Sequence, residues 1–252
     1  MNKNVYFVSD AHLGLKDGEK EEYKKSSLIE FIKMVRKEKA ALYIVGDFFD
    51  FWIEYKYVIP RHFFKVVRAL QEAAEDGCEI HIFGGNHDFW LGSFFTEELG
   101  VIVHPDPLRT EIEGKKFFIA HGDGILKRDR GYRILKRVLR NRFCIFLFKL
   151  IHPDIAFRIA EFVSGSSRHL TIRDQKFEEN EKKEIIQFGT SKINEGFDCV
   201  VTGHFHLPTN HKIDGKQIIN LGDWMKYFTY GYFDGEMFSL CYWDKPKNSK
   251  SK

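Results

Sequence analysis

The sequence has few cysteines and lacks any long hydrophobic run. The four cysteines, Cys78, Cys144, Cys199 and Cys241, show no Cys-x-x-Cys spacing, so we expect buried thiols in a reducing compartment rather than a disulfide framework or a thiolate zinc site. No apolar stretch reaches the roughly 18–20 residues that span a bilayer, and the first predicted strand begins too close to Met1 to leave room for a signal peptide. These absences predict a protein of the cytoplasm or of the cytoplasmic face of a membrane.

Length and composition fit one catalytic unit. The chain has 252 residues, of which 43% are apolar and 15% aromatic, enough to bury a sizeable core. Helical and strand patterns alternate through the first half, whereas strand patterns separated by Asp214-Gly215 and Asp234-Gly235 predict a β meander after residue 206. We therefore expect a single α/β domain over residues 1–244. The Lys/Ser/Asn-rich tail, 245–252, is expected to be disordered.

Five polar motifs each follow a short β-rich stretch. The stretches are 5–9, 42–45, 80–83, 117–120 and 199–202, and the motifs are Asp10-Ala11-His12, Gly46-Asp47, Gly85-Asn86-His87-Asp88, His121-Gly122-Asp123 and Gly203-His204-Phe205-His206. Side chains at strand ends reach the edge of a sheet where open α/β folds place their ligands. One such motif alone is more often a turn or a capping residue. Five of them in this order, each after a strand, indicate a two-metal hydrolase.

The residue types suit hard divalent cations. Carboxylate and amide oxygens with imidazole nitrogens favour ions such as Mn²⁺, and two metal ions about 3.5–4 Å apart need a carboxylate between them. We assign Asp10, His12, Asp47 and His206 to one ion, and Asp47, Asn86, His121 and His204 to the other. Asp47 is the predicted bridge.

The residue after Asn86 has a different predicted role. His87 is expected to meet a phosphoryl oxygen or to protonate the leaving group, without binding a metal itself. Asp88 is expected to fix the tautomer of His87, and Asp50 to orient His12. The predicted catalytic residues are Asp47, Asn86 and His87.

A basic and apolar segment separates the fourth motif from the fifth. Residues 127–173 contain twelve Lys or Arg and three Asp or Glu, although the whole chain has a net charge of only +3. The same segment contains the apolar run 143–151, and Pro153 divides it into two predicted helical stretches. The catalytic sheet does not need this segment, so we expect a helical cap over the metal site, at about residues 125–177.

Three interpretations of this cap remain open. Its helices could pack their apolar faces on the core and leave Lys and Arg in solvent. They could instead form a pocket or a membrane-facing patch for a ligand with an acyl tail and an anionic head. Nucleic-acid binding is disfavoured, because the segment is richer in Phe, Leu and Ile than a phosphate track requires.

The combined motifs resemble a known superfamily. Asp10-x-His12, Gly46-Asp47-x-x-Asp50, Gly85-Asn86-His87-Asp88, His121-Gly122 and Gly203-His204-x-His206 resemble the full signature of the calcineurin-like metallophosphoesterases, over residues 5–206. The resemblance implies a β-sandwich flanked by helices and the hydrolysis of phosphate esters or anhydrides. It does not choose the substrate.

A narrower resemblance covers nearly the whole chain. Residues 46–52, 121–124, the cap and 220–224 are similar to the UDP-2,3-diacylglucosamine pyrophosphohydrolases of lipid A synthesis. This similarity implies cleavage of an acylated UDP-sugar to UMP and 2,3-diacylglucosamine 1-phosphate. It also implies Mn²⁺ and peripheral association with the cytoplasmic face of a Gram-negative inner membrane, with no nucleic acid and no obligate protein partner.

The same resemblance suggests substrate contacts in the cap. Besides Asn86 and His87, the positions that resemble head-group contacts are Asp129, Tyr132, Ser167 and Arg168. His87 stands where the enterobacterial branch typically has Arg. Trp224 and Lys226 follow a strand end and are expected either to line the site or to pack in the core. The alternatives are a generic phosphodiesterase or phosphatase and a non-catalytic scaffold, although a scaffold would tend to lose the metal ligands that are intact here.

Overall fold

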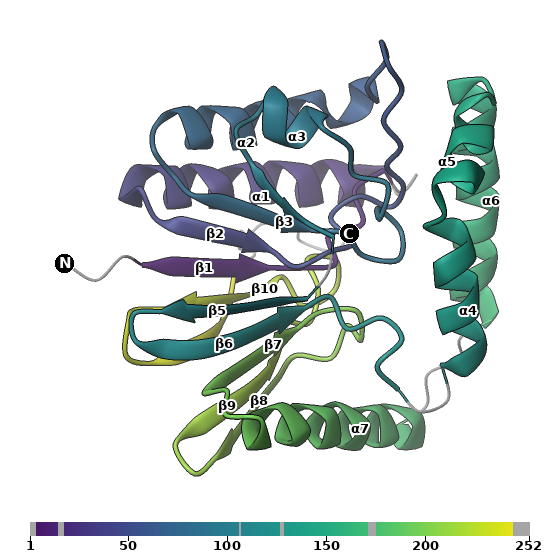
Figure 1. Cartoon of the computed structure of the whole chain (residues 1–252). Coiled ribbons are helices and arrows are strands. Elements are labelled where there is room, and N and C mark those ends of the chain that lie inside the picture. The colour runs from purple at the N-terminus through teal and green to yellow at the C-terminus, as the bar shows by residue number, and fades with distance from the viewer. Residues whose placement is uncertain (1–3, 15–17, 106, 127–128, 171–174, 244–252) are drawn as a thin grey trace, which may run out of the picture.

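Two β-sheets pack face to face between helices. The computed structural model describes residues 4–14, 18–105, 107–126, 129–170 and 175–243 (Figure 1). The predicted tail, 245–252, lies outside the described residues. This arrangement confirms the predicted β-sandwich flanked by helices.

The first sheet has six strands in the order β11-β10-β1-β2-β3-β4. They are β1 (Val5–Val8), β2 (Ala41–Ile44), β3 (Ile80–Phe83), β4 (Ile102–His104), β10 (Thr229–Phe233) and β11 (Phe238–Tyr242). The second sheet has the order β5-β6-β7-β9-β8. Its strands are β5 (Leu108–Ile112), β6 (Lys115–Ala120), β7 (Cys199–Thr202), β8 (Thr209–Ile213) and β9 (Lys216–Asn220).

Helices cover the outer faces of both sheets. The long helices α1 (Glu19–Glu38) and α2 (Phe64–Glu75) lie on the first sheet, and α7 (Gln175–Asn194) lies on the second (Figure 1). Shorter elements precede and follow α2, a 3-10 turn (Arg61–Phe63) and α3 (Phe94–Glu97). Both α1 and α2 belong to the alternation of helical and strand patterns predicted for the first half of the chain.

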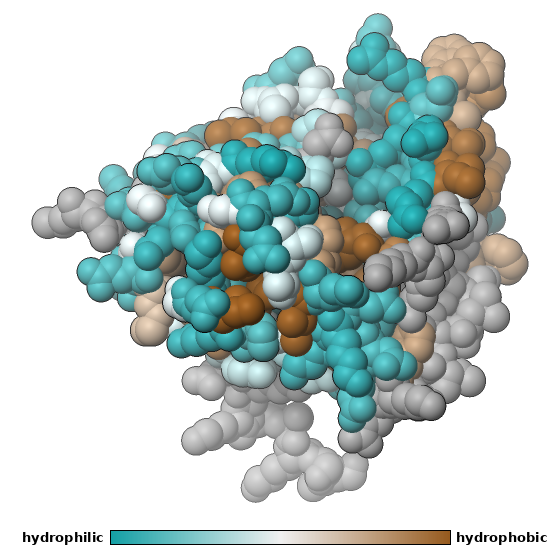
Figure 2. All heavy atoms as spheres, turned by 60° about the horizontal axis from the view of Figure 1, so that its bottom comes forward, coloured by the Kyte–Doolittle hydropathy of each residue, from teal (hydrophilic) through white to brown (hydrophobic). Residues whose placement is uncertain are grey.

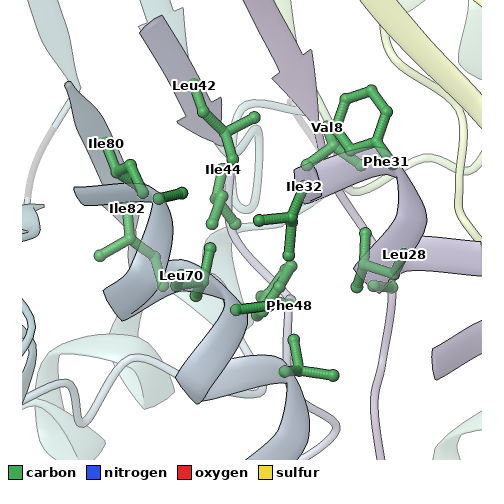
Figure 3. Packing of buried hydrophobic residues seen from close by; sticks show 14 of the residues in the cluster. Val8, Leu28, Phe31, Ile32, Leu42, Ile44, Phe48, Leu70, Ile80 and Ile82 are labelled. Atoms are coloured by element: carbon green, nitrogen blue, oxygen red, sulfur yellow. The ribbon is translucent and has the colours of Figure 1, made fainter. Parts of the chain in front are cut away.

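The alternation of side chains along the strands separates the core layers. On β1, Tyr6 and Val8 pack toward α1 and α2, whereas Val5 and Phe7 pack toward the second sheet, as the period of two in a strand requires. Figure 3 shows the layer between the first sheet and its helices. Of the cysteines, Cys78 and Cys199 are buried, whereas Cys144 and Cys241 are only half-buried.

The strands that carry the polar motifs end on the same side of the molecule. Strands β1, β2 and β3 are parallel to one another, and β6 is parallel to β7. Figure 1 shows that both sets point toward the helices α4–α6. The motifs therefore lie at the ends of two facing sheets, whereas the sequence suggested one sheet edge.

The meander predicted after residue 206 is wrong in one respect. Its four strands and both Asp-Gly turns are present, but β8 and β9 pair in the second sheet while β10 and β11 pair in the first. The chain crosses between the sheets after β9, where Leu221, Trp224 and Phe228 are buried. Leu221 packs between the two sheets, whereas Trp224 and Phe228 pack between the first sheet and its helices, so the crossing segment carries apolar side chains into both core layers.

The basic segment forms three helices where two were predicted. They are α4 (Arg130–Leu139), α5 (Arg142–Lys149) and α6 (Pro153–Leu170), and they stand across the motif-bearing end of the sandwich (Figure 1). Pro153 begins α6, a position where its missing N–H is not needed. The additional break lies at Asn141, whose side chain accepts a hydrogen bond from the N–H of Phe143 at 2.9 Å and so caps α5. Among the described residues, no helix is long and apolar enough to cross a bilayer.

Candidate active site

Asp10, at the end of β1, faces residues from the far end of the chain. Its Oδ2 atom accepts a hydrogen bond from the backbone N–H of His204 at 2.8 Å. Its Oδ1 atom lies 3.8 Å from Nε2 of His12 and 3.8 Å from Nε2 of His206. The structure thus brings three predicted ligands, Asp10, His12 and His206, into one group.

Asp47, after β2, joins this group to a second one. Its Oδ2 atom lies 3.5 Å from Nε2 of His12 and 3.4 Å from Nε2 of His121. Nε2 of His121 also lies 3.1 Å from Oδ1 of Asn86, and its ring meets that of His204 edge to face with centroids 5.1 Å apart. One oxygen of Asp47 therefore reaches both groups, as a bridging carboxylate must.

Two of the imidazoles are oriented by partners on their Nδ1 side. Nδ1 of His12 lies 3.3 Å from Oδ1 of Asp50, the contact predicted from the sequence. Nδ1–H of His121 donates to the carbonyl oxygen of Val45 at 2.9 Å. Both contacts leave Nε2 directed at the cluster. A hydrogen bond from Nδ1–H to an oxygen fixes the tautomer in which Nε2 is free to bind a metal ion.

The cluster fits the divalent cations that its residue types suggested. Three overlapping groups have ligand atoms close enough to hold a metal ion: Asp10, His12 and His206; His12, Asp47 and His87; and Asp47, His121 and His204. Oδ1 of Asp10 and Nε2 of His12 are buried and have no hydrogen-bond partner among the described residues. Buried polar atoms without a partner are costly, and a cation between them removes that cost.

The electrostatics of Asp47 and His121 also call for positive charge. Burial acts to raise the pKa of Asp47, but the imidazoles of His121 and His87 hold it well below its ordinary value. Burial acts to lower the pKa of His121, but the carboxylate of Asp47 raises it to about 10. The oxygens around Nε2 of His121 thus stabilise a cation at this point, whether a proton or a metal ion.

Five predicted ligands have the left-handed backbone conformation that non-glycine residues rarely adopt. They are Asp10 (φ 53°), His12 (φ 42°), Asp47 (φ 48°), His204 (φ 70°) and His206 (φ 53°). Such strained residues persist where surrounding structure over-determines them, and they cluster at functional sites.

Glycines allow the ligand loops to approach one another. A Cβ atom added to Gly85 would collide with the carboxylate of Asp47, and one added to Gly203 would collide with Oδ2 of Asp10. The glycines in the Gly-Asn and Gly-His motifs are therefore required by close packing against the ligands themselves.

The predicted contact between Asp88 and His87 is wrong. The carboxylate of Asp88 is fully buried and accepts hydrogen bonds from four backbone N–H groups, those of Asp47, Phe48, Phe49 and Gly85, at 2.8–3.1 Å. Nδ1 of His87 instead lies 3.1 Å from the carbonyl oxygen of Asp50. The oxygens of Asp88 already accept hydrogen bonds from backbone N–H groups of the loops after β2 and β3, so Asp88 does not also set the tautomer of His87.

Helix α4 contacts the ligand loops through polar side chains. The hydroxyl of Tyr132 donates to Oδ2 of Asp123 at 2.6 Å, and Nζ of Lys136 lies 2.7 Å from the same atom. Burial, and then the charge of Asp123, raises the pKa of Tyr132. Tyr132 therefore faces the loop that follows His121.

The other cap residues predicted to contact substrate differ in their placement. Asp129 precedes α4 and accepts a hydrogen bond from the N–H of Leu126 at 3.3 Å. Ser167 and Arg168 belong to α6, but their side chains lie outside the described residues.

Arg140, at the end of α4, was not predicted to take part. Its guanidinium donates to the carbonyl oxygens of Pro105, Gly84 and Gly85 at 3.0–3.5 Å. Next to it, Nε1 of Trp90 donates to the carbonyl oxygen of Leu139 at 2.9 Å. The end of α4 is thus bound to the loop that carries Asn86 and His87; no sequence motif distinguished Arg140 from the other basic residues of the cap.

Asp223 is a further contact of the cluster that was not assigned a role. Its Oδ2 atom lies 3.5 Å from Nδ1 of His206. Gly222-Asp223 repeats, at the end of β9, the Gly46-Asp47 pattern, and that repetition could have identified it. The adjacent Trp224 is fully buried and donates to Oγ of Ser27 at 3.2 Å, so it packs in the core and does not line the site; Lys226 is exposed.

The chain matches known proteins over most of its length. Residues 3–208 match the family model described as calcineurin-like phosphoesterase. The UDP-2,3-diacylglucosamine hydrolase of Porphyromonas gingivalis is 34% identical, over 93% of this chain and 95% of that protein. The enzyme of the same name from Haemophilus influenzae is 29% identical, over 89% of this chain and 92% of that protein.

Comparison of folds agrees with these matches. A solved archaeal phosphodiesterase superposes with a TM-score of 0.50 at 16% identity, over 95% of this chain and 99% of that one. At this identity the likeness concerns the fold alone. The sequence matches carry the assignment: the chain belongs to the calcineurin-like phosphoesterases and, among them, to the family of the UDP-2,3-diacylglucosamine hydrolases.

Proposed function

We propose that this protein is a metal-dependent hydrolase that cleaves the diphosphate of UDP-2,3-diacylglucosamine to UMP and 2,3-diacylglucosamine 1-phosphate. The observation that carries the proposal is the convergence of carboxylate, amide and imidazole groups from the ends of two sheets beneath a basic helical layer. The full-length relatives named for this activity supply the substrate.

The proposed ligand sets follow the two groups in the cluster. Asp10, His12, Asp47 and His206 hold one ion, and Asp47, Asn86, His121 and His204 hold the other. We propose Mn²⁺ as the ion, since the donors are carboxylate, amide and imidazole. When bound, such a pair of ions supplies a hydroxide at neutral pH and neutralises phosphoryl charge.

We propose that His87 contacts the phosphoryl group during the reaction. Its backbone N–H donates to Oδ1 of Asp47 at 2.8 Å, and its Nδ1 faces the carbonyl oxygen of Asp50. These contacts leave Nε2 to donate to a phosphoryl oxygen when the ring is protonated. The grouping of His87 with His12 and Asp47 keeps its ring beside the cluster.

We propose that the cap, residues 125–177, holds the acyl part of the substrate and meets the inner membrane. Helix α4 turns Tyr132 and Lys136 toward the ligand loops, whereas Ile134, Leu135 and Val138 are exposed. Exposed apolar side chains continue on α5, on α6 and in the turn between them: Phe143, Phe146, Leu147, Leu150, Ile155, Ile159 and Phe162.

Charge and apolar surface together favour a lipid bilayer as the partner of this face. Figure 2 shows hydrophobic side chains along the right-hand edge, on the side where Figure 1 places α5 and α6. A contiguous exposed apolar surface marks an interaction site, and the excess of Lys and Arg in residues 127–173 adds attraction to anionic lipid head groups. We propose that this surface associates with the cytoplasmic face of the inner membrane.

Metal removal and two ligand variants test the proposal. We expect chelator-treated protein to release no UMP from UDP-2,3-diacylglucosamine and Mn²⁺ to restore release. We also expect Asp47→Ala and His121→Ala to lose nearly all turnover, with Glu236→Ala, at an exposed position, as the control. Near-normal turnover in either ligand variant would contradict the assignment of the metal site.

A further inference from the structure

An open pocket lies beside the metal cluster and has no role in the function described so far. Its volume is about 300 Å³, at the lower end of the range of ligand pockets and sufficient for a fragment such as a nucleoside. The residues that line it include Glu178 and Lys182 of α7, Pro208, Tyr227 and Tyr242. The position of the pocket and the residues that line it together indicate which part of the substrate it can hold.

The topology places this pocket at the metal-bearing end of the sandwich. Strand β11 runs antiparallel to β10, which runs antiparallel to β1, so Tyr242 near the end of β11 lies at the same end as Asp10. Strand β8 begins at Thr209, three residues after His206. The pocket therefore lies at the β8 and β11 edges of the two sheets.

A shared carboxylate joins the pocket wall to the cluster. Oδ1 of Asp223 accepts a hydrogen bond from the backbone N–H of Tyr227 at 3.0 Å. Oδ2 of the same residue lies 3.5 Å from Nδ1 of His206, and Leu207, also in the pocket wall, follows His206 directly. The same side chain thus positions a predicted metal ligand and an aromatic wall of the pocket.

The C-terminal end of α4 is bound at the opposite edge of the sandwich. Arg140 of α4 donates to the carbonyl oxygen of Pro105, between β4 and β5, and these are the edge strands on the other side of each sheet. The loop of Asn86 and His87 lies on the side of Arg140, and His206 lies on the side of the pocket, so a diphosphate across both has one end toward this part of the cap and the other toward the pocket. With the acyl chains at the cap, the nucleoside is the part left for the pocket.

The lining suits a nucleoside and disfavours a phosphate. Two tyrosines and a proline offer flat apolar faces on which a base can stack. Glu178 and Glu179 can accept hydrogen bonds from ribose hydroxyls, and the amine of Lys182 can donate to a base carbonyl. Two carboxylates against one amine make the lining acidic, so a phosphate would be repelled and the uncharged uridine is preferred.

We infer that this pocket, between α7 and the loops after His206 and Asp223, binds the uridine of the nucleoside diphosphate substrate. The inference rests on the proposed function for the identity of the nucleoside. It assigns substrate-binding roles to Tyr227, Tyr242 and Lys182, none of which belongs to a metal-site motif.

The test compares Tyr242→Ala and Lys182→Ala with the control Lys183→Ala in the metal-loaded protein. Tyr242 is 63% exposed, and Lys182 and Lys183 are exposed neighbours on α7, so all three variants are expected to fold. We expect KM for UDP-2,3-diacylglucosamine and the Kd of UMP, measured by calorimetry, to rise about ten-fold in the two pocket variants. We expect kcat to change less than two-fold and the control to match the wild type.

Two further measurements separate this inference from the proposed function. Hydrolysis of bis(p-nitrophenyl) phosphate, which has no nucleoside, should be equal in all variants, and binding of 2,3-diacylglucosamine 1-phosphate should be unchanged. If the wild type cleaves the UDP-sugar but the pocket variants bind UMP as tightly as it does, the inference is wrong. If the wild type cleaves only the simple diester, the proposed function is wrong, and the pocket is tested by UMP binding alone. In that case, failure of the wild type to bind UMP at millimolar concentration would also refute the uridine pocket.

Discussion

The carboxylate of Asp47 accepts a hydrogen bond from the backbone N–H of His87 through Oδ1 at 2.8 Å, while its Oδ2 atom faces His12 and His121. One side chain therefore meets imidazoles of both proposed ligand sets and fixes the backbone of His87, the residue proposed to contact the phosphoryl group. This relationship links the loop after β2 to the loop after β3. It makes the position of His87 depend on the residue proposed to bridge the metals.

The variant His87→Ala should separate metal binding from catalysis. The proposed ligands are untouched, so we expect metal analysis to find two ions per chain, as in the wild type. Turnover should fall roughly 10²–10⁴-fold, because a positioned proton donor or charge contact to the phosphoryl group is lost. Loss of metal together with activity would instead identify His87 as a ligand, as its grouping with His12 and Asp47 permits.

Replacing Asp88 with asparagine should destabilise the fold. Four buried backbone N–H groups point at the carboxylate of Asp88, and an amide cannot accept from all of them. We expect the free energy of unfolding, measured by urea titration with a chelator present, to fall by about 2–4 kcal/mol. The control is Asp234→Asn in an exposed hairpin turn, which should change it by less than about 1 kcal/mol. Equal effects of the two variants would refute the role given to Asp88.

Arg140→Lys should weaken the connection between the cap and the catalytic loop. A lysine keeps the charge but cannot reach three carbonyl oxygens at once, as the guanidinium of Arg140 does. We expect kcat to fall about ten- to hundred-fold, because small displacements of catalytic groups have large effects on rate, and metal content to stay the same. The fluorescence of Trp90, which is bound to Leu139, should also change. Arg137→Lys, at an exposed position of the same helix, is the matched control, and a kcat equal to that of this control would show that the contact is dispensable.

Acid should destabilise the protein partly through His104. Burial, and then the charge of His81, lowers the pKa of His104 below its ordinary value of 6.5. Nε2 of His104 lies 2.8 Å from Nδ1 of His81, whose Nε2 lies 2.9 Å from Oε1 of Glu79. The folded protein therefore binds fewer protons here than the unfolded chain, and stability is lost as the pH falls from about 6.5 through the lowered pKa.

The variant His104→Gln tests this dependence. Its free energy of unfolding should decline less between pH 7 and pH 5 than that of the wild type, both measured with a chelator present. His152→Gln, at a side chain that is 66% exposed, should follow the wild type. Identical pH profiles for all three proteins would show that His104 does not contribute.

The exposed apolar face of α5 should mediate membrane binding. We expect sedimentation with vesicles of phosphatidylcholine and phosphatidylglycerol to exceed that with phosphatidylcholine alone and to weaken at high salt. Phe146→Ser should reduce binding, whereas Met237→Ser, an equally exposed apolar side chain on the hairpin between β10 and β11, should not. Equal loss of vesicle binding in both variants would show that the apolar face of α5 is not the membrane-binding surface.

The sequence predicted the convergence of the polar motifs better than the elements around them. Motifs such as Gly46-Asp47 and His121-Gly122 follow buried strands, and a strand end fixes where the next side chains lie. The crossing between the sheets after β9 could not be predicted in this way, because the Asp-Gly turn of each hairpin pairs its own two strands and does not indicate which sheet the hairpin joins. The break between α4 and α5 was not predicted, because the single asparagine that caps α5, Asn141, is not distinguished by any motif.

The contacts that hold the predicted ligands and their loops in place were predicted only in part. Asp50 could be paired with His12 because both belong to motifs of the same site, and the structure confirms the contact. The partners of Asp88 and Arg140 are backbone groups, which every residue has and no motif can distinguish. Such contacts follow from the path of the loops and not from residue type.

The most direct test of the proposed function is Mn²⁺-dependent release of UMP from UDP-2,3-diacylglucosamine, measured beside unacylated UDP-N-acetylglucosamine. We expect strong preference for the acylated substrate, since the cap offers an apolar surface that the unacylated sugar cannot use. Equal or absent turnover of both, with activity on a simple phosphodiester, would retain the metal site and contradict the assigned substrate.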